Sequence, residues 1–303
     1  MRKFFIAAAV LSAAFVTPAR ADLSVFACEP EWGALAKEIG GDKVSIYTAT
    51  TGAQDPHQVQ ARPSLIAKAH GADVTVCTGA ELEIGWLPMI EQQAANTKIN
   101  AGTQGAFAAT SFVQLQEIPT RLDRAEGDIH AAGNPHIQTD PRMILLVAKP
   151  LSERFAELDP ANAALYTQRY TDFAQRFSAA IAKWGAEAAP LKGVPIAVQH
   201  TAWIYMLNWL GLKQVVALEP KPGVQPSSGY LAQVLETIQR QPVKMVIRAA
   251  YEDDRPSAFI SERAKIPAVT LPFTVGGTDD AKDLFSLYDD TIKRLLAAAA
   301  AKP

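Results

Sequence analysis

The stretch that decides the fold is residues 44–77, which reads VSIYTATTGAQDPHQVQARPSLIAKAHGADVTVC. Residues 44–47 alternate apolar and polar side chains, as a half-buried strand does. A proline and a serine then open a predicted helix at 63–71, and residues 73–76 form a second short apolar strand. This order predicts a βαβ unit, and therefore a parallel sheet that binds its ligand beyond the carboxyl ends of the strands.

The same pattern extends in both directions from this unit. Another short strand is predicted at 23–27, and Pro226-Ser227 precedes a helical segment at 231–238 much as a proline and a serine open the first helix. Further strands are predicted at 194–198, 215–218, 243–247 and 268–271. The sequence therefore predicts an α/β protein with two βα lobes, each built on a parallel sheet.

One long helix is expected between the two halves. After Asp159-Pro160, aromatic and apolar side chains recur every three or four residues from Tyr166 to Trp184, which is typical of an amphipathic helix that packs on a core. We predict an N-terminal lobe at 22–155, a linking helix at 156–190 and a C-terminal lobe at 191–303. A single helix is a stiff linker, so large closure motions are not expected.

The first 21 residues are predicted to be a cleaved signal peptide. Two basic residues precede an apolar stretch at 4–16, and Ala19-Arg20-Ala21 matches a cleavage site. The apolar part is too short to span a bilayer, so we expect a soluble protein exported to the periplasm. A lipoprotein site at Cys28 is a weaker alternative, because Arg20 and Asp22 interrupt the apolar run before it.

Charge and cysteine content narrow the function further. The chain has 29 Lys and Arg against 31 Asp and Glu, a balance that argues against a nucleic-acid partner. The two cysteines, Cys28 and Cys77, each follow a short apolar strand. In an exported protein they would form a disulfide if these strands are parallel neighbours; otherwise they are two buried thiols. A thiolate metal pair is less favoured, because the histidines already offer a metal site.

Three histidines stand where a βα protein places its functional groups. His57 and His136 each follow a proline in a loop, and His200 comes directly after the strand at 194–198. Neutral imidazole is a preferred ligand of Zn²⁺. Because the three lie far apart in the sequence, they cannot form a local zinc-finger knuckle and would have to converge across a cleft between the lobes. The alternatives are a surface-loop histidine at position 57 and a core histidine among aromatic side chains at position 200.

A fourth ligand should be an oxygen. Asp279, Asp280, Glu252 and water are the candidates, and Asp279 is favoured because Gly276 and Gly277 let the backbone approach closely. Asp279 fits equally well as the cap of a final helix at 281–300. Three imidazoles and one carboxylate suit Zn²⁺ better than Mn²⁺, which prefers more oxygen ligands.

The two remaining histidines have weaker claims to such a site. His130 is either an accessory ligand or part of a solvated loop. His70 is left out, because it falls at the expected end of a helix, where its charge would suit the helix dipole.

These motifs resemble one known family, the periplasmic zinc- and manganese-binding proteins of metal ABC importers, which includes zinc-uptake and treponemal metal-binding proteins. Asp55-Pro56-His57, Asn134-Pro135-His136 and His200 with its following Trp203 and Tyr205 are similar, in this order, to its three ligand motifs. The resemblance implies a monomeric receptor that binds Zn²⁺ and delivers it to an ABC transporter membrane permease, with no chemical step. It leaves open whether a periplasmic zinc chaperone loads the site.

The sequence also departs from the family pattern. Asn134 stands where the family usually has aspartate, and Gln138 where it has an aromatic residue. Thr274 falls near the position of the acidic fourth ligand, so Asp279 has no clean counterpart. Two other hypotheses remain: a secreted zinc-dependent hydrolase, although no His-Glu-x-x-His motif is present, and a Mn²⁺-binding receptor or adhesin of the same fold.

Overall fold

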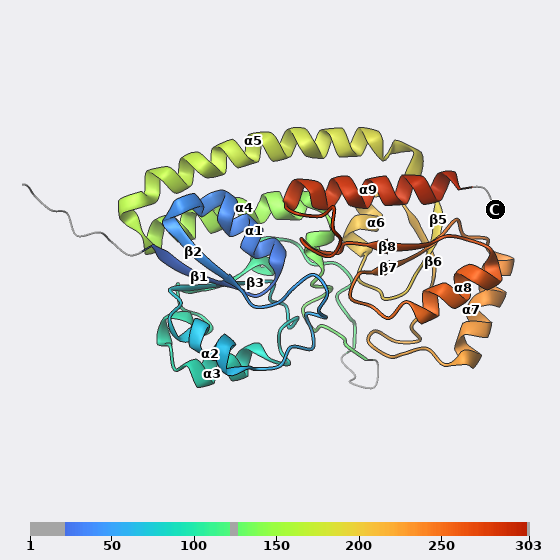
Figure 1. Ribbon diagram of the computed structural model, residues 1–303, viewed down its shortest axis with the longest axis horizontal. Helices are drawn as coiled ribbons and strands as arrows, with labels where there is room; N and C mark the ends of the chain where they lie inside the picture. Colours follow the sequence, from blue (N-terminus) through green and yellow to red (C-terminus); the bar gives the residue numbers. More distant parts are fainter. Residues whose placement is uncertain (1–21, 122–126, 302–303) are drawn as a thin grey trace, which may run out of the picture.

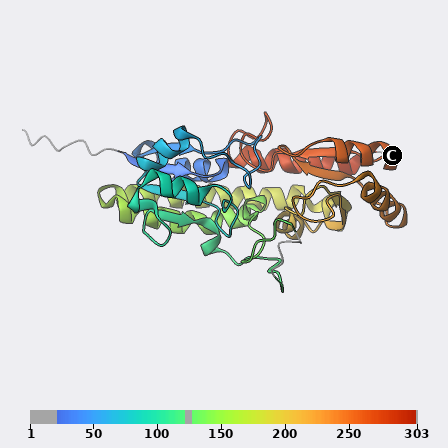
Figure 2. The same ribbon diagram turned by 90° about the horizontal axis from the view of Figure 1, so that it is seen from below.

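The computed structural model describes residues 22–121 and 127–301. The predicted signal peptide at 1–21 lies outside this range. Two four-stranded parallel sheets, each flanked by helices, form two lobes that lie end to end along the molecule (Figures 1 and 2). The predicted α/β architecture with two parallel-sheet lobes is confirmed.

The N-terminal sheet has the strand order β2-β1-β3-β4. Val25 in the central strand pairs with Ile46 on one side and Val74 on the other. Helices α1 and α4 pack on one face of the sheet and α2 and α3 cover the other (Figure 1). The elements are β1 (Leu23–Ala27), α1 (Pro30–Gly40), β2 (Val44–Thr48), α2 (Pro63–His70), β3 (Val74–Cys77), α3 (Leu87–Ala94), β4 (Ala106–Ala108) and α4 (Pro141–Leu158).

The C-terminal sheet repeats this plan with the order β6-β5-β7-β8. Helices α7 and α8 pack on one face, while α6 and α9 contribute to the core on the other. The sequence predicted all four strands to within a few residues. The elements are β5 (Pro195–Val198), α6 (Ile204–Leu210), β6 (Lys213–Ala217), α7 (Ser228–Arg240), β7 (Val246–Ala249), α8 (Arg255–Ala264), β8 (Ala268–Leu271) and α9 (Leu284–Ala300).

The long helix α5 (Ala163–Glu187) extends across both lobes (Figure 1). It is shorter than the predicted segment 156–190, because residues up to Leu158 finish α4. Asp159 then leaves the helical conformation, as expected for a residue before proline, and residues 160–162 form a 3₁₀ turn. The linking helix therefore begins only after this break.

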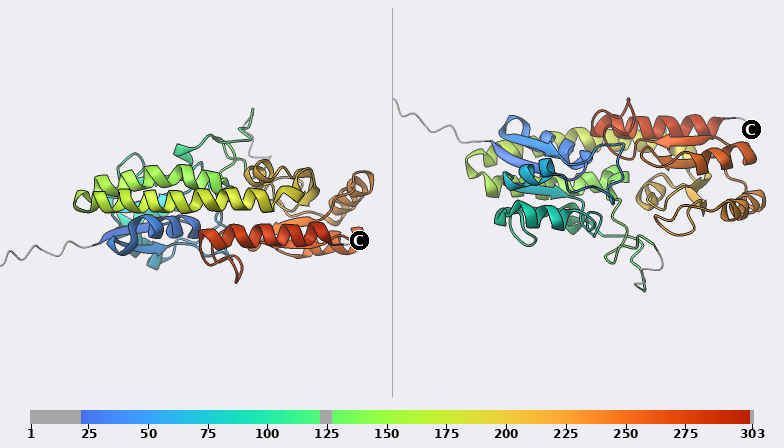
Figure 3. Two further views of the ribbon diagram at one scale, coloured as in Figure 1. Left: turned by 90° about the horizontal axis from the view of Figure 1, so that it is seen from above. Right: turned by 60° about the horizontal axis from the view of Figure 1, so that its bottom comes forward.

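Aromatic packing joins α5 to α9, which runs beside it along the molecule (Figure 3). Phe177 and Trp184 are buried on α5, and the Trp184 ring lies 5.1 Å from that of Tyr288 on α9. One hydrophobic cluster includes these side chains and the strands of both sheets, so the lobes share a continuous core. The aromatic face predicted on the long helix is thus a packed face.

Two sequence alternatives are decided by the fold. Cys28 and Cys77 lie at the ends of the neighbouring strands β1 and β3 and form a disulfide, so they are not two free thiols. The alternative in which Asp279 caps the final helix is wrong, because α9 begins at Leu284 and Asp283 caps it in a capping box with Ser286. Among the described residues, no helix combines the length and apolar character needed to cross a bilayer.

Candidate metal site

Asp55 fixes the orientation of His57 in the loop between β2 and α2. One carboxylate oxygen, Oδ1, accepts a hydrogen bond from the His57 backbone nitrogen at 2.9 Å and lies 2.8 Å from its Nδ1. Burial alone would raise the pKa of Asp55, but the hydrogen bonds and charge of His57 lower it, so the carboxylate stays ionised. The other ring nitrogen, Nε2, is buried and has no hydrogen-bond partner in the described chain.

Asn134 positions His136 just before α4. Its Oδ1 accepts a hydrogen bond from the His136 backbone nitrogen at 3.1 Å, and its amide donates to the Thr201 carbonyl at 3.0 Å. Tyr205 of α6 also donates from its hydroxyl to the Asn134 carbonyl at 2.7 Å. The asparagine that departs from the family pattern therefore ties the His136 loop to the C-terminal lobe, which an ionised aspartate could not do by donating.

Glu219, which comes two residues after β6, plays the corresponding role for His200. Its Oε2 lies 2.7 Å from His200 Nδ1 and also accepts a hydrogen bond from the backbone nitrogen of Gly223 at 2.8 Å. Burial opposes protonation of His200, but the hydrogen bond and negative charge of Glu219 outweigh it and raise the pKa of this imidazole. With Nδ1 engaged, Nε2 of His200 is left for a ligand.

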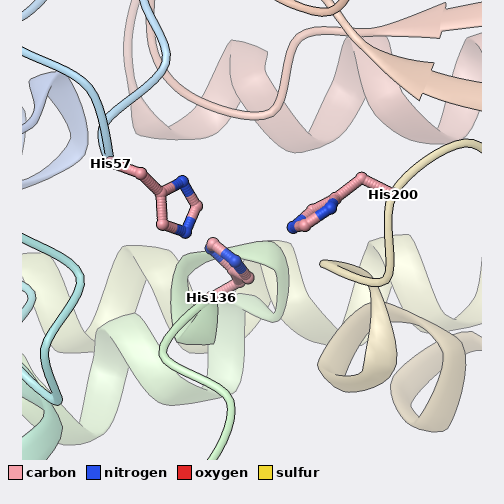
Figure 4. A group of neighbouring side chains, drawn as sticks. All are labelled: His57, His136 and His200. Carbon is pink, nitrogen blue, oxygen red and sulfur yellow. The ribbon is translucent and has the colours of Figure 1, made fainter. Parts of the chain in front are cut away.

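The three histidines point toward one another between the lobes (Figure 4). Each offers a ring nitrogen, and these three atoms lie within 4.8 Å of one another. Nδ1 of His136 is also buried without a partner in the part of the chain that the structure describes. Burial, together with the charges of the neighbouring histidines, keeps the pKa of His136 well below its usual value. A neutral imidazole with unpaired nitrogens can accept a cation, so the donor set fits a divalent metal ion.

Of the other residues considered as ligands from the sequence, His130 lies beside the three histidines, whereas Asp279, Asp280 and His70 do not belong to the group. The His130 ring centre is 5.4 Å from that of His57, and burial beside the histidines lowers its pKa to about 4. Asp279 and Asp280 are exposed, and Asp280 pairs with Lys293 at 3.4 Å. Neither aspartate belongs to the ligand group that the described residues form. His70 ends α2 and lies 2.7 Å from the Ala94 carbonyl, apart from the site.

Glu252 is the candidate carboxylate that shares a cavity with the histidines. This cavity, of about 150 Å³, is lined by His57, His200, Glu219 and Glu252 among others. One oxygen of Glu252 accepts from the Ala249 backbone nitrogen, while Oε1 is buried without a partner among the described residues. Burial raises the pKa of Glu252 to about 7, although the nearby His200 partly offsets this.

Glu219 was not among the residues predicted from the sequence. It comes just after a predicted strand, as His200 does, so the rule that identified His200 could also have found it. The sheet order could not be predicted from the sequence. It places β6 beside β5 and so brings the Glu219 carboxylate to the His200 imidazole.

One protein-family model matches nearly the whole described chain. The model of the family described as "ZnuA: Zinc-uptake complex component A periplasmic" matches residues 25–298. Among characterised relatives, a manganese ABC transporter substrate-binding lipoprotein PsaA of Streptococcus anginosus is 21% identical over 259 residues, covering 84% of this chain and 81% of its own. The metal ABC transporter substrate-binding lipoprotein SloC of Streptococcus mutans is 21% identical over 245 residues, covering 79% and 77%.

Solved structures share the fold. A crystal structure of ZnuA superposes with a TM-score of 0.75 at 21% identity and covers 92% of this chain and 100% of its own. A manganese-bound periplasmic metal-binding protein of Candidatus Liberibacter asiaticus gives a TM-score of 0.74 at 16% identity, covering 91% and 99%. With two βα lobes, a helix across both and three histidines between them, the chain belongs to the ZnuA family of metal-binding receptors for ABC transporters.

Proposed function

We propose that this receptor captures Zn²⁺ between its lobes through His57, His136 and His200 and delivers the ion to a membrane permease. The observation that carries the proposal is the convergence of three ring nitrogens, with two imidazole nitrogens buried and unpaired within the described residues. Imidazole nitrogens bind Zn²⁺ at about 2.0–2.1 Å, so small side-chain movements would complete the site. Asp55 and Glu219 would fix the rings of their histidines while the ion binds.

The choice of Zn²⁺ over Mn²⁺ rests on the ligand atoms. Two carboxylates at the site, Asp55 and Glu219, engage ring nitrogens of their histidines, and buried nitrogens of His57 and His136 remain unpaired among the described residues. Mn²⁺ prefers a more oxygen-rich shell. Manganese is the second candidate, because several relatives are named for it and because Glu252 could contribute an oxygen.

For the fourth position we propose Glu252 or a solvent molecule. Glu252 lines the cavity and has a buried oxygen without a partner in the described structure. Asp279, favoured from the sequence, is exposed and would join the site only if its loop rearranged. The Glu252→Gln and Asp279→Asn variants separate these candidates, because removal of the ligand that completes the shell should lower metal affinity more than removal of the other carboxylate.

The cellular setting follows from the same proposal. A receptor of this family acts outside the cytoplasm, so the segment 1–21 would be cleaved on export and the mature protein would work as a monomer in the periplasm. Its partner would be the permease, with a zinc chaperone as an optional donor. A hydrolase would need a positioned general base and a substrate, and an activity screen against esters, phosphates and peptides tests that alternative.

The decisive experiment is calorimetry on mature protein stripped of metal. We expect one Zn²⁺ to bind per chain and to raise the melting temperature, because a ligand at 100 times its Kd stabilises the native state by about 2.7 kcal/mol. The variants His57→Ala, His136→Ala and His200→Ala should each lose most of this affinity, while His70→Ala serves as the control outside the site. If Zn²⁺ produces no binding heat and no shift in melting temperature, the proposal is excluded. Tighter binding of Mn²⁺ than of Zn²⁺ would reassign the cargo.

A further inference from the structure

A second group of potential ligands lies in the N-terminal lobe. The sulfurs of Cys28 and Cys77 and a carboxylate oxygen of Glu83 all lie within 4.8 Å of one another, and all three residues are buried. We propose that reduction of the Cys28–Cys77 disulfide converts this group into a second site for a thiophilic divalent cation such as Zn²⁺. The receptor would then bind one ion when oxidised and two when reduced.

The backbone keeps the two sulfurs together whether or not they are bonded. The Cys28 backbone nitrogen donates to the Val76 carbonyl at 2.9 Å, and Ala27 pairs with Val76 in the parallel ladder. The two cysteine Cα atoms are 4.8 Å apart as a result of this pairing. Since neighbouring strands hold this spacing by their own hydrogen bonds, the thiols stay adjacent after reduction. Adjacent thiolates are the preferred ligands of Zn²⁺ in closed sites.

Two glutamates supply oxygen ligands beside the sulfurs. Backbone nitrogens of Thr78 and Gly79 donate to the Glu83 carboxylate at 2.7 and 3.1 Å, which fixes its position. Glu29 lies beside it: its Oε2 accepts a hydrogen bond from Thr78 Oγ1 at 3.1 Å, and its Oε1 is buried without a partner among the described residues. Neither glutamate has an ion-pair partner among the described residues, so a bound cation would be the first positive charge beside their oxygens.

Cys77 and Glu83 can be reached from the surface. Both line a groove of about 470 Å³, together with Gly79 and Glu91. A small dithiol or phosphine can attack the disulfide from this groove. With a dithiol, one thiolate displaces a protein thiolate to form a mixed disulfide, and the second thiol then closes the reductant's own disulfide and releases the other cysteine. Binding of the metal ion releases two thiol protons to solvent and needs no further redox partner.

The test uses Co²⁺ as a spectroscopic probe in the His57→Ala/His200→Ala variant, which removes the site between the lobes. We expect the protein reduced with a phosphine to bind one Co²⁺ with a thiolate-to-cobalt charge-transfer band, and Zn²⁺ to displace it. The oxidised form of the same protein should bind none. Far-ultraviolet circular dichroism of both forms checks the fold, which we expect to be retained because the main hydrophobic cluster contains neither cysteine.

Variants of the groove assign the ligands. Glu83→Gln should lower Co²⁺ affinity by about tenfold or more in the reduced protein. Glu91→Gln changes the same charge in the same groove outside the ligand group and should leave the affinity unchanged. A folded, reduced protein without a thiolate band, or equal Co²⁺ binding by the oxidised form, would overturn the proposal. The role of the three histidines is unaffected by either result, because that site is absent from the protein tested.

Discussion

Glu219 Oε2 lies 2.7 Å from His200 Nδ1, so a single carboxylate from the end of one strand orients an imidazole at the end of the next. The same oxygen accepts from the Gly223 backbone nitrogen at 2.8 Å. The carbonyl of Pro222, in the same turn, accepts from the Asp128 backbone nitrogen of the other lobe at 3.0 Å. Glu219 therefore connects a proposed metal ligand to a contact that joins the lobes.

The Glu219→Gln variant should bind Zn²⁺ about 10- to 100-fold more weakly than the parent protein. Glutamine keeps the shape and the acceptor for His200 Nδ1–H, but it removes the negative charge that makes the imidazole a stronger base. Calorimetry with Zn²⁺ measures the change. Glu236→Gln, which removes an exposed charge on α7, is the matched control and should bind as the parent does. Parental affinity in Glu219→Gln would show that the carboxylate does not support a ligand.

Tyr205 provides a second test of how the lobes cooperate. Its hydroxyl donates to the Asn134 carbonyl at 2.7 Å and accepts from the Gln116 backbone nitrogen at 3.0 Å. Tyr205→Phe removes both bonds beside His136, so we expect a loss of about 1–3 kcal/mol in stability and weaker Zn²⁺ binding. Denaturant unfolding and calorimetry measure the two effects.

The control for this loss is Tyr170→Phe, a half-buried tyrosine on α5 whose hydroxyl makes none of these contacts. It should change neither quantity by a comparable amount. If Tyr205→Phe lowers stability but leaves the affinity intact, the hydroxyl supports the fold without positioning the ligand loop.

The sequence predicted most of the architecture because its signals are local. The alternation of apolar and polar residues that marks a strand spans only a few neighbouring residues, as in segment 44–48. The same holds for the proline and serine that begin a helix, as in segment 63–70. The strand β4 has three residues, too few to show a period. The cap of α9 depends on how the preceding loop folds, where the Gly276 nitrogen donates to the Ala281 carbonyl at 2.6 Å. The sequence offers both Asp279 and Asp283 as caps, and the structure uses Asp283.

The candidate metal site, like the fold, could be predicted from the sequence only where the signal is local. The positions of His57, His136 and His200 after strands and prolines are local facts, and the fold brings all three together. Which carboxylates face them depends on strand order and loop packing, so Glu219 was missed. Metal ligation itself stays a prediction until it is measured.

Buried glutamates at the junction of the lobes predict an unusual pH dependence. Burial raises the pKa of Glu31 to about 7, despite the hydrogen bond from Thr274 of the other lobe. A carboxyl whose pKa is higher in the folded than in the unfolded state stabilises the fold fully below the unfolded value near 4.5, and this contribution is lost as pH rises through about 7. The metal-free protein should therefore lose part of its stability between pH 5 and pH 8.

The Glu31→Gln variant isolates this contribution. Its amide oxygen can still accept from Thr274, but it never has to ionise in the interior. We expect it to be about 1–3 kcal/mol more stable than the parent at pH 8 and to show less change between pH 5 and pH 8. Urea unfolding at several pH values, with chelator present, measures both. If the stabilities of parent and variant change in parallel across this range, the pKa of Glu31 is not raised in the native state.

The close approach of two glycine loops sets how tightly the lobes meet beside His57. A Cβ atom added to Gly52 would lie 2.3 Å from the Gly277 backbone nitrogen and 2.5 Å from the Gly276 carbonyl carbon. Backbone atoms cannot yield as a flexible side chain does, so Gly52→Ala must push the loops apart. We expect it to cost about 1–3 kcal/mol of stability and to weaken Zn²⁺ binding by moving the His57 loop.

Gly185→Ala in helix α5 is the matched control, because a Cβ there meets nothing within 4 Å. It should stabilise the protein by about 0.4–1 kcal/mol. Thermal unfolding with and without Zn²⁺ measures both variants, and a Gly52→Ala protein with parental stability and affinity would show that the lobes can separate at this contact without disturbing the site.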